Sequence, residues 1–228
     1  MDKSTDELIE EFVAVGGDFR GWRPGWNIRP TDPVAVVLES MKQGPEPVRR
    51  LELARWSLTP GWSKTLTMKV PTFNARSEGI TEKASFAAAI RSKRALIPAS
   101  GYYEWQTDPV TNTKTPFYIH APHGQTMAFA AIYSWWKDRS LSDDDPRAWT
   151  LTTTMLTADA VHTLEQIHDR NPVPLPRELW GDWLDPRIEG TQQMVDATVA
   201  AGARVTETLE IMPIAAVTDE RPQPAAPG

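Results

Sequence analysis

The middle of the chain constrains the fold most strongly, because it consists of short strand-like segments joined by turns. Runs of aliphatic, aromatic and β-branched residues predict strands at 94–97, 102–106, 116–120, 127–134 and 149–155. Turn-forming residues separate these runs, as in the segment Thr107–Thr113 with its Asp-Pro and Thr-Asn pairs. Connections of this kind join neighbouring antiparallel strands.

Helical patterns lie before, between and after these strands. Ser4 and Glu7 match a capping box, and the apolar residues that follow share one face of a helix over Ser4–Val15. We expect further helices at 81–91, 158–166, 176–183 and 191–201, and further strands at 34–38, 51–58 and 204–208. This order favours the α+β class, with an antiparallel, barrel-like or strongly bent β-sheet and flanking helices.

The chain shows no internal repeat and no linker-like stretch. We therefore expect a single domain over residues 1–220, followed by a flexible Pro- and Ala-rich tail at 221–228. No stretch approaches the roughly 20 apolar residues of a membrane span, and the polar start Met1–Glu7 is no secretory signal. These features predict a cytoplasmic protein with no membrane partner.

Composition removes several kinds of chemistry. The 228 residues contain no cysteine, which excludes disulfides, thiolate metal sites and thiol nucleophiles from the chain as written. The net charge of −6 argues against a protein that coats nucleic acid through its overall charge, although a local basic groove is compatible with an acidic body. Most of the 10 tryptophans are expected in the core, and an exposed one would be a stacking platform.

Among the four histidines, one stands in polar company. His120, His123 and His162 are interpreted as surface residues. His168 lies in the segment Ile167-His168-Asp169-Arg170-Asn171-Pro172, which places three polar groups at one turn. Taken alone, this segment favours a capping and salt-bridge arrangement over a catalytic one.

Two further segments carry candidate functional groups. Asn74-Ala75-Arg76-Ser77-Glu78 offers an amide that both donates and accepts, and a guanidinium that grips a phosphate bidentately. Taken alone, the segment favours a polar turn with a surface ion pair over a phosphate site. Glu104 lies between aromatic residues on a predicted strand, and apolar surroundings raise a carboxyl pKa toward the range useful for proton transfer. The alternative is the outward position of an alternating strand.

The combination of these segments is more specific than any one of them. The chain carries, in order, Asn74-Ala75-Arg76-Ser77-Glu78, Leu96-Ile97-Pro98-Ala99-Ser100-Gly101-Tyr102-Tyr103-Glu104-Trp105 and Ile167-His168-Asp169-Arg170. Supporting blocks are Trp26-Asn27-Ile28-Arg29-Pro30-Thr31 and Trp56-Ser57-Leu58-Thr59-Pro60-Gly61-Trp62. From about Asp6 to Leu175 this pattern resembles the SRAP (SOS-response-associated peptidase) family.

The resemblance implies a DNA-damage protein that shields abasic sites in single-stranded DNA by a covalent crosslink, with self-processing peptidase and lyase character. In that family the amine and thiol of an N-terminal cysteine close a thiazolidine ring on the sugar aldehyde. Catalytic roles would fall to Asn74, Glu104 and His168. Arg76 and Arg170 would bind phosphates, and Trp62 would be an apolar wedge between bases. The family further implies a monomer with no metal or organic cofactor.

One departure from the family pattern concerns the nucleophile itself. The family begins Met-Cys-Gly-Arg and an aromatic residue in a short strand before its first helix, whereas Met1-Asp2-Lys3 leads directly into that helix here. Two explanations compete: a start written downstream of the true one, which we favour, or a variant that keeps the site but cannot form the thiazolidine. Two other functions stay open, a non-catalytic single-stranded DNA-binding module and an unrelated hydrolase that uses Glu104 and His168.

Overall fold

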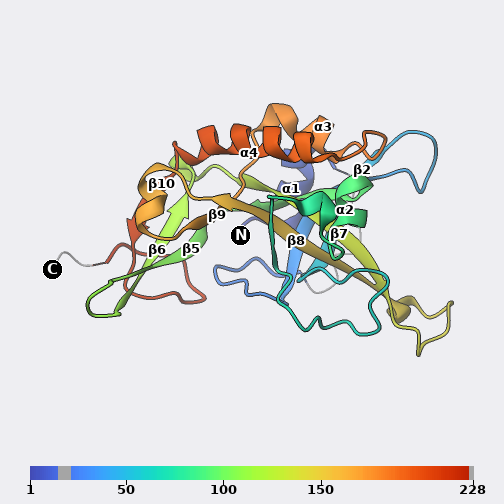
Figure 1. Ribbon diagram of the computed structural model, residues 1–228, viewed down its shortest axis with the longest axis horizontal. Helices are drawn as coiled ribbons and strands as arrows, with labels where there is room; N and C mark the ends of the chain where they lie inside the picture. Colours follow the sequence, from blue (N-terminus) through green and yellow to red (C-terminus); the bar gives the residue numbers. More distant parts are fainter. Residues whose placement is uncertain (15–21, 226–228) are drawn as a thin grey trace.

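The computed structural model of the protein describes residues 1–14 and 22–225. Its centre is a closed five-stranded β-barrel (Figure 1). The strands follow the order β2-β1-β4-β7-β8, and a parallel pairing of β2 with β8 at Arg55–Thr152 closes the barrel. Their bounds are β1 (Pro33–Ser40), β2 (Val48–Trp56), β4 (Arg94–Ala99), β7 (Met127–Lys137) and β8 (Trp149–Asp159). The α+β class and the barrel-like sheet predicted from the sequence are confirmed.

Strand β8 continues beyond the barrel wall, and this extension organises one end of the molecule. On one edge β3 (Asn74–Arg76) takes over from β2 and runs parallel to β8, with Asn74 opposite Met155. On the other edge β9 (Arg170–Pro172) takes over from β7 and runs antiparallel, with Arg170 opposite Asp159. Two segments far apart in the sequence therefore flank one strand end.

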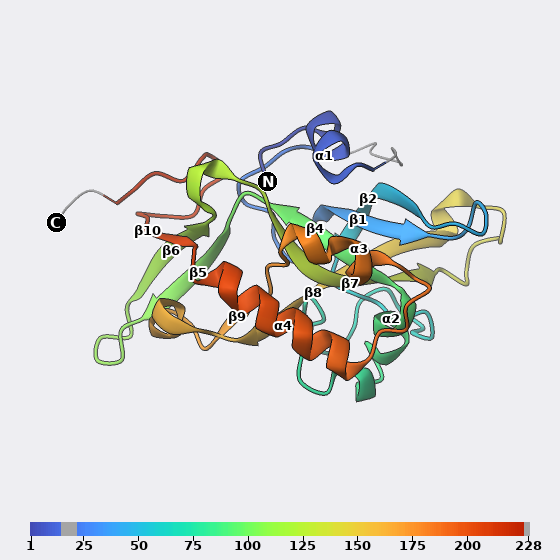
Figure 2. The ribbon, with the colours of Figure 1, turned by 90° about the horizontal axis from the view of Figure 1, so that it is seen from above.

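A second, three-stranded sheet lies beside this end of the barrel (Figures 1 and 2). It is antiparallel in the order β10-β6-β5, with β5 (Tyr102–Thr107), β6 (Lys114–His120) and β10 (Glu210–Pro213). Within the described residues β5 pairs on one side only, so it forms the edge of this sheet.

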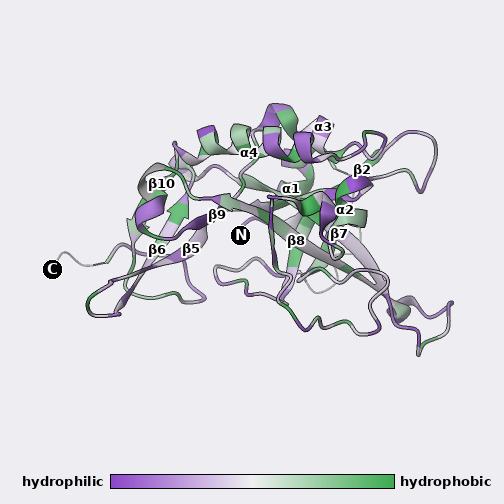
Figure 3. Ribbon diagram, in the orientation of Figure 1, coloured by the Kyte–Doolittle hydropathy of each residue, from purple (hydrophilic) through white to green (hydrophobic). Residues whose placement is uncertain are grey.

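Helices cover the outside of the barrel. They are α1 (Thr5–Phe12), α2 (Ala87–Ser92), α3 (Trp180–Leu184) and α4 (Gln192–Thr206), with 3-10 turns at Ile80–Glu82, Pro122–Gly124, Pro146–Ala148, His162–Gln166 and Arg177–Leu179. Helix α4 runs from the three-stranded sheet to α2 (Figure 2), with hydrophilic and hydrophobic residues along its length (Figure 3).

The first helix begins at the predicted capping box. The Ser4 side chain accepts from the Glu7 N–H, and the Glu7 side chain accepts from the Ser4 N–H. The helix ends at Phe12, and Val13 follows it in the left-handed conformation. Val15, the predicted last residue of this helix, lies outside the described residues.

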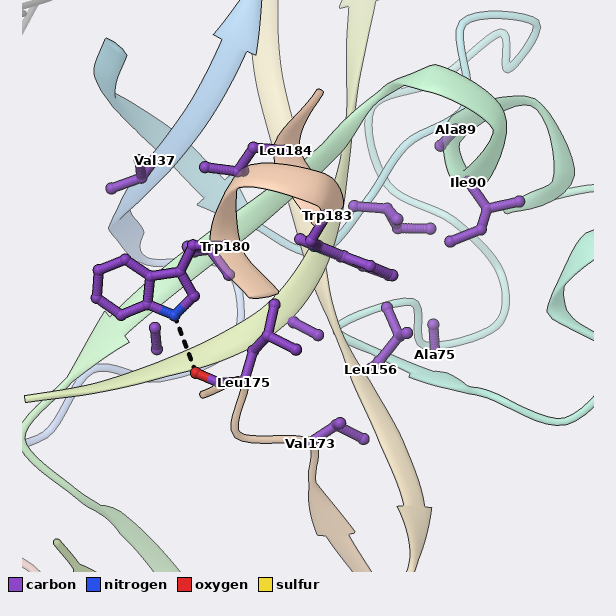
Figure 4. Packing of buried hydrophobic residues seen from close by; sticks show 14 of the residues in the cluster. Val37, Ala75, Ala89, Ile90, Leu156, Val173, Leu175, Trp180, Trp183 and Leu184 are labelled. Atoms are coloured by element: carbon purple, nitrogen blue, oxygen red, sulfur yellow. Dashed lines mark hydrogen bonds between the residues drawn. The ribbon is translucent and has the colours of Figure 1, made fainter. Parts of the chain in front are cut away.

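The strands bury both of their faces, because the barrel has its own interior and the helices cover its outer wall. Val36, Phe129 and Ala131 belong to the inner cluster, and Val37 and Leu156 to the outer one. Figure 4 shows Trp180 and Trp183 of α3 over this outer wall, with the Trp180 indole N–H donating to the Leu175 carbonyl at 2.9 Å. Large aromatic side chains supply much of the apolar area that stabilises such a layer.

Several predicted elements differ from the structure, among them the helix over 81–91, of which only Ala87–Ser92 is α-helical after a 3-10 turn at Ile80–Glu82. The sequence predicts one helix over 158–166, but β8 continues to Asp159 and only His162–Gln166 forms a 3-10 turn. It also predicts a strand at 204–208, but α4 extends to Thr206 and the strand is Glu210–Pro213. In both places strand pairing or helix packing outweighs local preference.

The predicted flexible tail is described only in part. Residues 226–228 lie outside the described residues. Before them, the Ala225 N–H donates to the Pro213 carbonyl at 2.9 Å, and Ile214 and Pro224 form a β-bridge. Arg221 lies over the Trp26 ring, with 5.8 Å between its guanidinium carbon and the ring centroid.

Candidate active site

Most of the site residues that the sequence pointed to lie on the edge strand β5 and on the segments that flank the extended end of β8. Asn74 and Arg76 are the first and last residues of β3, and Glu104 lies in the middle of β5. His168 lies in the short connection that leads into β9, and Arg170 is the first residue of β9. The Gln106 side chain amide donates to the Gln166 carbonyl at 2.7 Å, which ties β5 to that connection.

Glu104 is a half-buried carboxyl beside His168. Burial is the largest influence and raises the pKa of Glu104, and the nearby Asp169 carboxylate raises it further. The charge of His168 and the Trp105 backbone N–H act in the opposite direction, but the net shift is upward. A carboxyl of this kind exchanges protons closer to neutral pH than an ordinary glutamate does.

The His168 ring is oriented through one nitrogen. Its Nδ1 lies 3.0 Å from both the backbone N and the carbonyl O of Arg170, and 3.1 Å from Oδ1 of Asp169. The neutral ring accepts the Arg170 N–H at Nδ1, and the protonated ring pairs with Asp169. The imidazole is about half exposed, so it is accessible to a ligand from solvent.

Arg170 is engaged by carboxylates. Its guanidinium donates to both oxygens of Glu78 at 3.1 and 2.9 Å, to Asp159 at 2.7 Å and to the Thr157 carbonyl at 2.7 Å. The side chain is only 14% exposed. This arrangement joins the turn after β3 to the end of β8 and to β9, so Arg170 holds the three segments together. The contacts of Arg170 therefore match the salt-bridge interpretation of the segment 167–172.

Arg76 is the more accessible cation of the two predicted phosphate ligands, because it is exposed at the end of β3. Lys83 lies next to it and donates from Nζ to the Arg76 carbonyl at 2.9 Å. Burial lowers the pKa of Lys83 most, Glu78 raises it, and Arg170 and Arg76 lower it further. Arg76 and Lys83 thus form a local surface with two cations, close to the Glu78 carboxylate that pairs with Arg170. Sequence reasoning missed Lys83, because its place in a predicted helix carried no sign of this contact.

Trp62 extends the same surface. It is 58% exposed, and its indole N–H points to the Ala84 carbonyl at 3.4 Å, next to Lys83 in the chain. Asn74 is exposed at the start of β3, on the same face of the strand as Arg76. An exposed aromatic ring beside cations is the arrangement that single-stranded nucleic acid binding uses.

The described N-terminus lies near the beginning of β5. The Met1 α-amine donates to the Gly25 carbonyl at 2.7 Å, and the Met1 sulfur lies 3.8 Å from the Ser100 hydroxyl oxygen. Burial lowers the pKa of this α-amine, and Asp2 raises it by a smaller amount.

Among the described residues no group of three or more His, Asp or Glu side chains is arranged to hold a metal ion. No helix in the described part of the chain is long and apolar enough to cross a membrane.

The barrel, the β8 extension and the sequence motifs together define a scaffold with a Glu–His pair beside a cationic and aromatic surface. The chain belongs to the SOS response associated peptidase (SRAP) family, whose model matches residues 1–218. The resemblance inferred from the sequence is thereby confirmed.

Named relatives include bacterial and animal proteins. The abasic site processing protein YoqW of Bacillus subtilis (strain 168) is 32% identical over 187 residues, which cover 80% of this chain and 76% of that protein. The abasic site processing protein HMCES of Xenopus tropicalis is 29% identical over 194 residues, covering 74% of this chain and 56% of that protein.

Solved structures share the fold. A protein of Bacteroides thetaiotaomicron superposes with a TM-score of 0.73 at 20% identity, over 94% of this chain and 90% of that one. A phage-related protein of Bordetella bronchiseptica reaches a TM-score of 0.67 at 23% identity, over 94% of this chain and 92% of that one.

Proposed function

We propose that this protein binds abasic sites in single-stranded DNA and processes them covalently, with Glu104 and His168 as its proton-transfer groups. The named relatives are abasic site processing proteins, which supports the lesion as substrate. The observation that carries the proposal is Glu104: a half-buried carboxyl of raised pKa, beside a half-exposed His168 that is oriented by backbone contacts.

The chemistry follows from the aldehyde at C1′ of the ring-opened abasic sugar. An amine adds to this carbonyl, and the carbinolamine loses water to give an imine; both steps need proton transfers that Glu104 is suited to make. His168 assists opening of the sugar ring. When the amine belongs to an N-terminal cysteine, its thiol S–H adds across the C=N bond, and a thiazolidine closes without another leaving group.

Two side activities use the same groups. Hydrolysis of the bond before such a cysteine would expose its amine, which is the self-processing peptidase step. Removal of a C2′ proton from the imine would expel the 3′ phosphate, which is the lyase step. The 228 residues contain no cysteine, so thiazolidine closure requires a cysteine-led segment in addition to them.

The DNA strand would follow the surface formed by Trp62, Lys83 and Arg76. Arg76 and Lys83 supply positive charge for phosphates, and the Trp62 ring supplies a face for stacking or wedging between bases. Asn74 would position the attacking terminus from the same face of β3. Arg170 would act by holding β3 and β9 in place, because carboxylates already engage its guanidinium.

The decisive experiment compares the 228-residue chain with the same chain preceded by a Met-Cys-Gly-Arg-Phe leader. Each is incubated with a single-stranded oligonucleotide that contains one abasic site, and a denaturing gel reports the covalent adduct. We expect the adduct only with the leader. Glu104→Gln and His168→Gln in the leader form should slow its formation about 100-fold, whereas the exposed Glu165→Gln should leave the rate unchanged. A stable adduct on the 228-residue chain, or none with the leader, would overturn the proposal.

A non-catalytic single-stranded DNA-binding module on the same fold is the second candidate. It is favoured by the absence of cysteine from the 228 residues and by the exposed Trp62. For such a module the affinity for an undamaged oligonucleotide, measured by fluorescence anisotropy, equals that for the abasic one. This affinity would also be unchanged by addition of the leader and by Glu104→Gln.

A further inference from the structure

A cavity of about 450 Å³ lies on the three-stranded sheet, between β6, the segment near Trp26 and the chain after β10. This volume falls within the roughly 300–1,000 Å³ typical of small-molecule sites. Its wall includes Asp2, Trp26, Ser100, Tyr118, His120 and Arg221.

The register of β5 and β6 puts the cavity and Glu104 on opposite faces of the sheet. Glu104 is paired with Phe117, and Tyr103 is paired with Tyr118. Successive side chains of a strand point to opposite faces, so Tyr118 and His120 face away from Glu104. The cavity is therefore separate from the candidate active site.

Aromatic rings form two walls of the cavity at a steep angle to each other. The Trp26 and Tyr118 ring centroids are 6.4 Å apart with an interplanar angle of 71°, while His120 stacks on Tyr118 at 5.1 Å. Arg221 lies over the Trp26 ring, and its planar guanidinium also stacks on flat ligands. Such a corner fits a flat heteroaromatic ring, which stacks on one wall and meets the other edge-on.

Polar groups at the rim of the cavity offer both hydrogen-bond acceptors and hydrogen-bond donors. Asp2 supplies a carboxylate, of which one oxygen accepts from the Ser100 hydroxyl at 2.5 Å, and Arg221 supplies N–H donors. Both charges act on Tyr118: burial raises its pKa most, Tyr103 and Asp2 raise it further, and Arg221 lowers it. A carboxylate at the rim disfavours a bare phosphate but accepts from the amino edge of a base.

We propose that this cavity binds one unpaired nucleobase, with preference for bases that carry an exocyclic amino group. The ring stacks against Trp26 and meets Tyr118 edge-on, the amino group donates to the second oxygen of Asp2, and Arg221 donates to ring acceptors. This proposal rests on the proposed function only for the source of the nucleobase, because single-stranded DNA supplies unpaired bases.

The test uses free mononucleotides, so that it does not depend on abasic-site chemistry. The 228-residue chain is titrated with dGMP, dAMP, dCMP and dTMP in a calorimeter, with 1,2-dideoxyribose 5-phosphate as the probe that lacks both a base and an aldehyde. We expect all four nucleotides to bind, dTMP the most weakly, and 1,2-dideoxyribose 5-phosphate not to bind. Equal binding of 1,2-dideoxyribose 5-phosphate would overturn the proposal.

Variants locate the binding. Trp26→Ala should weaken dGMP binding about tenfold or more, since loss of one stacking partner has an effect of this size. Trp149→Ala, an exposed tryptophan of the barrel, should leave the affinity unchanged. Trp26 contacts Tyr118, so Trp26→Ala also changes the packing of the cavity wall. Arg221→Ala and Asp2→Asn are therefore made as well, because both residues are exposed. Asp2→Asn should abolish the preference for the other nucleotides over dTMP. Unchanged affinities in all three cavity variants would overturn the proposal. A Trp26→Ala leader form that still crosslinks abasic DNA would show that the two sites are independent.

Discussion

At the scale of single residues, the buried Arg94 and the half-buried Glu104 show opposite solutions to the cost of burying charge. Arg94 stays charged because five backbone carbonyls, those of Trp183, Ile90, Arg91, Asp185 and Ile188, accept from its guanidinium at 2.6–3.0 Å. Glu104 has fewer partners, and burial raises its pKa. The first residue stabilises the fold, and the second is the residue that we propose as a proton-transfer group.

Replacement of Arg94 should therefore destabilise the protein strongly. Arg94→Met removes the donors of five carbonyls, and we expect a loss of about 3 kcal/mol or more in the free energy of unfolding. Urea denaturation followed by tryptophan fluorescence measures it. The exposed neighbour Arg91→Met provides the control and should change the free energy of unfolding by less than about 0.5 kcal/mol. Equal effects of the two variants would contradict this role.

The raised pKa of Glu104 predicts a pH dependence of stability. The folded state holds this proton more tightly than the unfolded state, whose value is near the ordinary 4.5. The contribution of the Glu104 proton to the free energy of unfolding is fully present below pH 4.5 and is lost as pH rises through the pKa of the folded state. Glu104→Gln cannot ionise, so it does not lose this stability as pH rises. The melting temperature of the variant should therefore exceed that of the parent at pH 7, and the two melting temperatures should converge toward pH 4. A difference independent of pH would argue against the shift.

At the scale of elements, α4 approaches the barrel closely through a residue without a side chain. A Cβ atom at Gly202 would lie 2.8 Å from the Pro174 carbonyl oxygen and 2.8 Å from a Val173 methyl carbon. Gly181 on α3, in contrast, has open space at the same position. The close contact lets α4 cover the segment that follows β9, and with it the strand that carries Arg170.

Alanine at these two glycines should have opposite effects. Gly202→Ala forces α4 away from the segment behind it and should destabilise the protein by about 1–3 kcal/mol. Gly181→Ala meets no neighbour and favours the helix, so it should be neutral or stabilising by up to about 1 kcal/mol. Thermal denaturation of both variants measures the difference. Two similar melting temperatures would show that the helix shifts without cost.

At the scale of the whole molecule, a net charge of −6 means that DNA affinity has to come from a local cationic surface. Arg76 and Lys83 form such a surface, while the carboxylates of Glu78 and Asp159 compensate Arg170. The distribution of charge, rather than its sum, is therefore the relevant quantity for binding.

The salt dependence of binding tests this distribution. Lys83→Met should weaken binding to single-stranded DNA and reduce the slope of log affinity against log salt by about 1. Lys42→Met, at the far end of the β1–β2 hairpin, should leave the slope unchanged. Anisotropy titrations across a salt series give both slopes. Identical slopes for parent and Lys83→Met would exclude Lys83 from phosphate contact.

The amino-acid sequence by itself determined the α+β class, most strand positions, the capping box of α1 and membership of the family. These features depend on local periodicity, turn chemistry and short motifs, which are written in consecutive residues. The roles of Asn74, Glu104 and His168 stay predictions that rest on the motifs.

Only the tertiary structure decided which residues meet. It closed the barrel through the β2–β8 pairing, extended β8 between β3 and β9, and turned Arg170 toward Glu78 and Asp159. It also brought Lys83 to Arg76 and assembled the aromatic cavity from Asp2, Trp26, Tyr118 and Arg221. Such contacts join residues distant in sequence, and their formation depends on the packing of the whole chain, which no local pattern records.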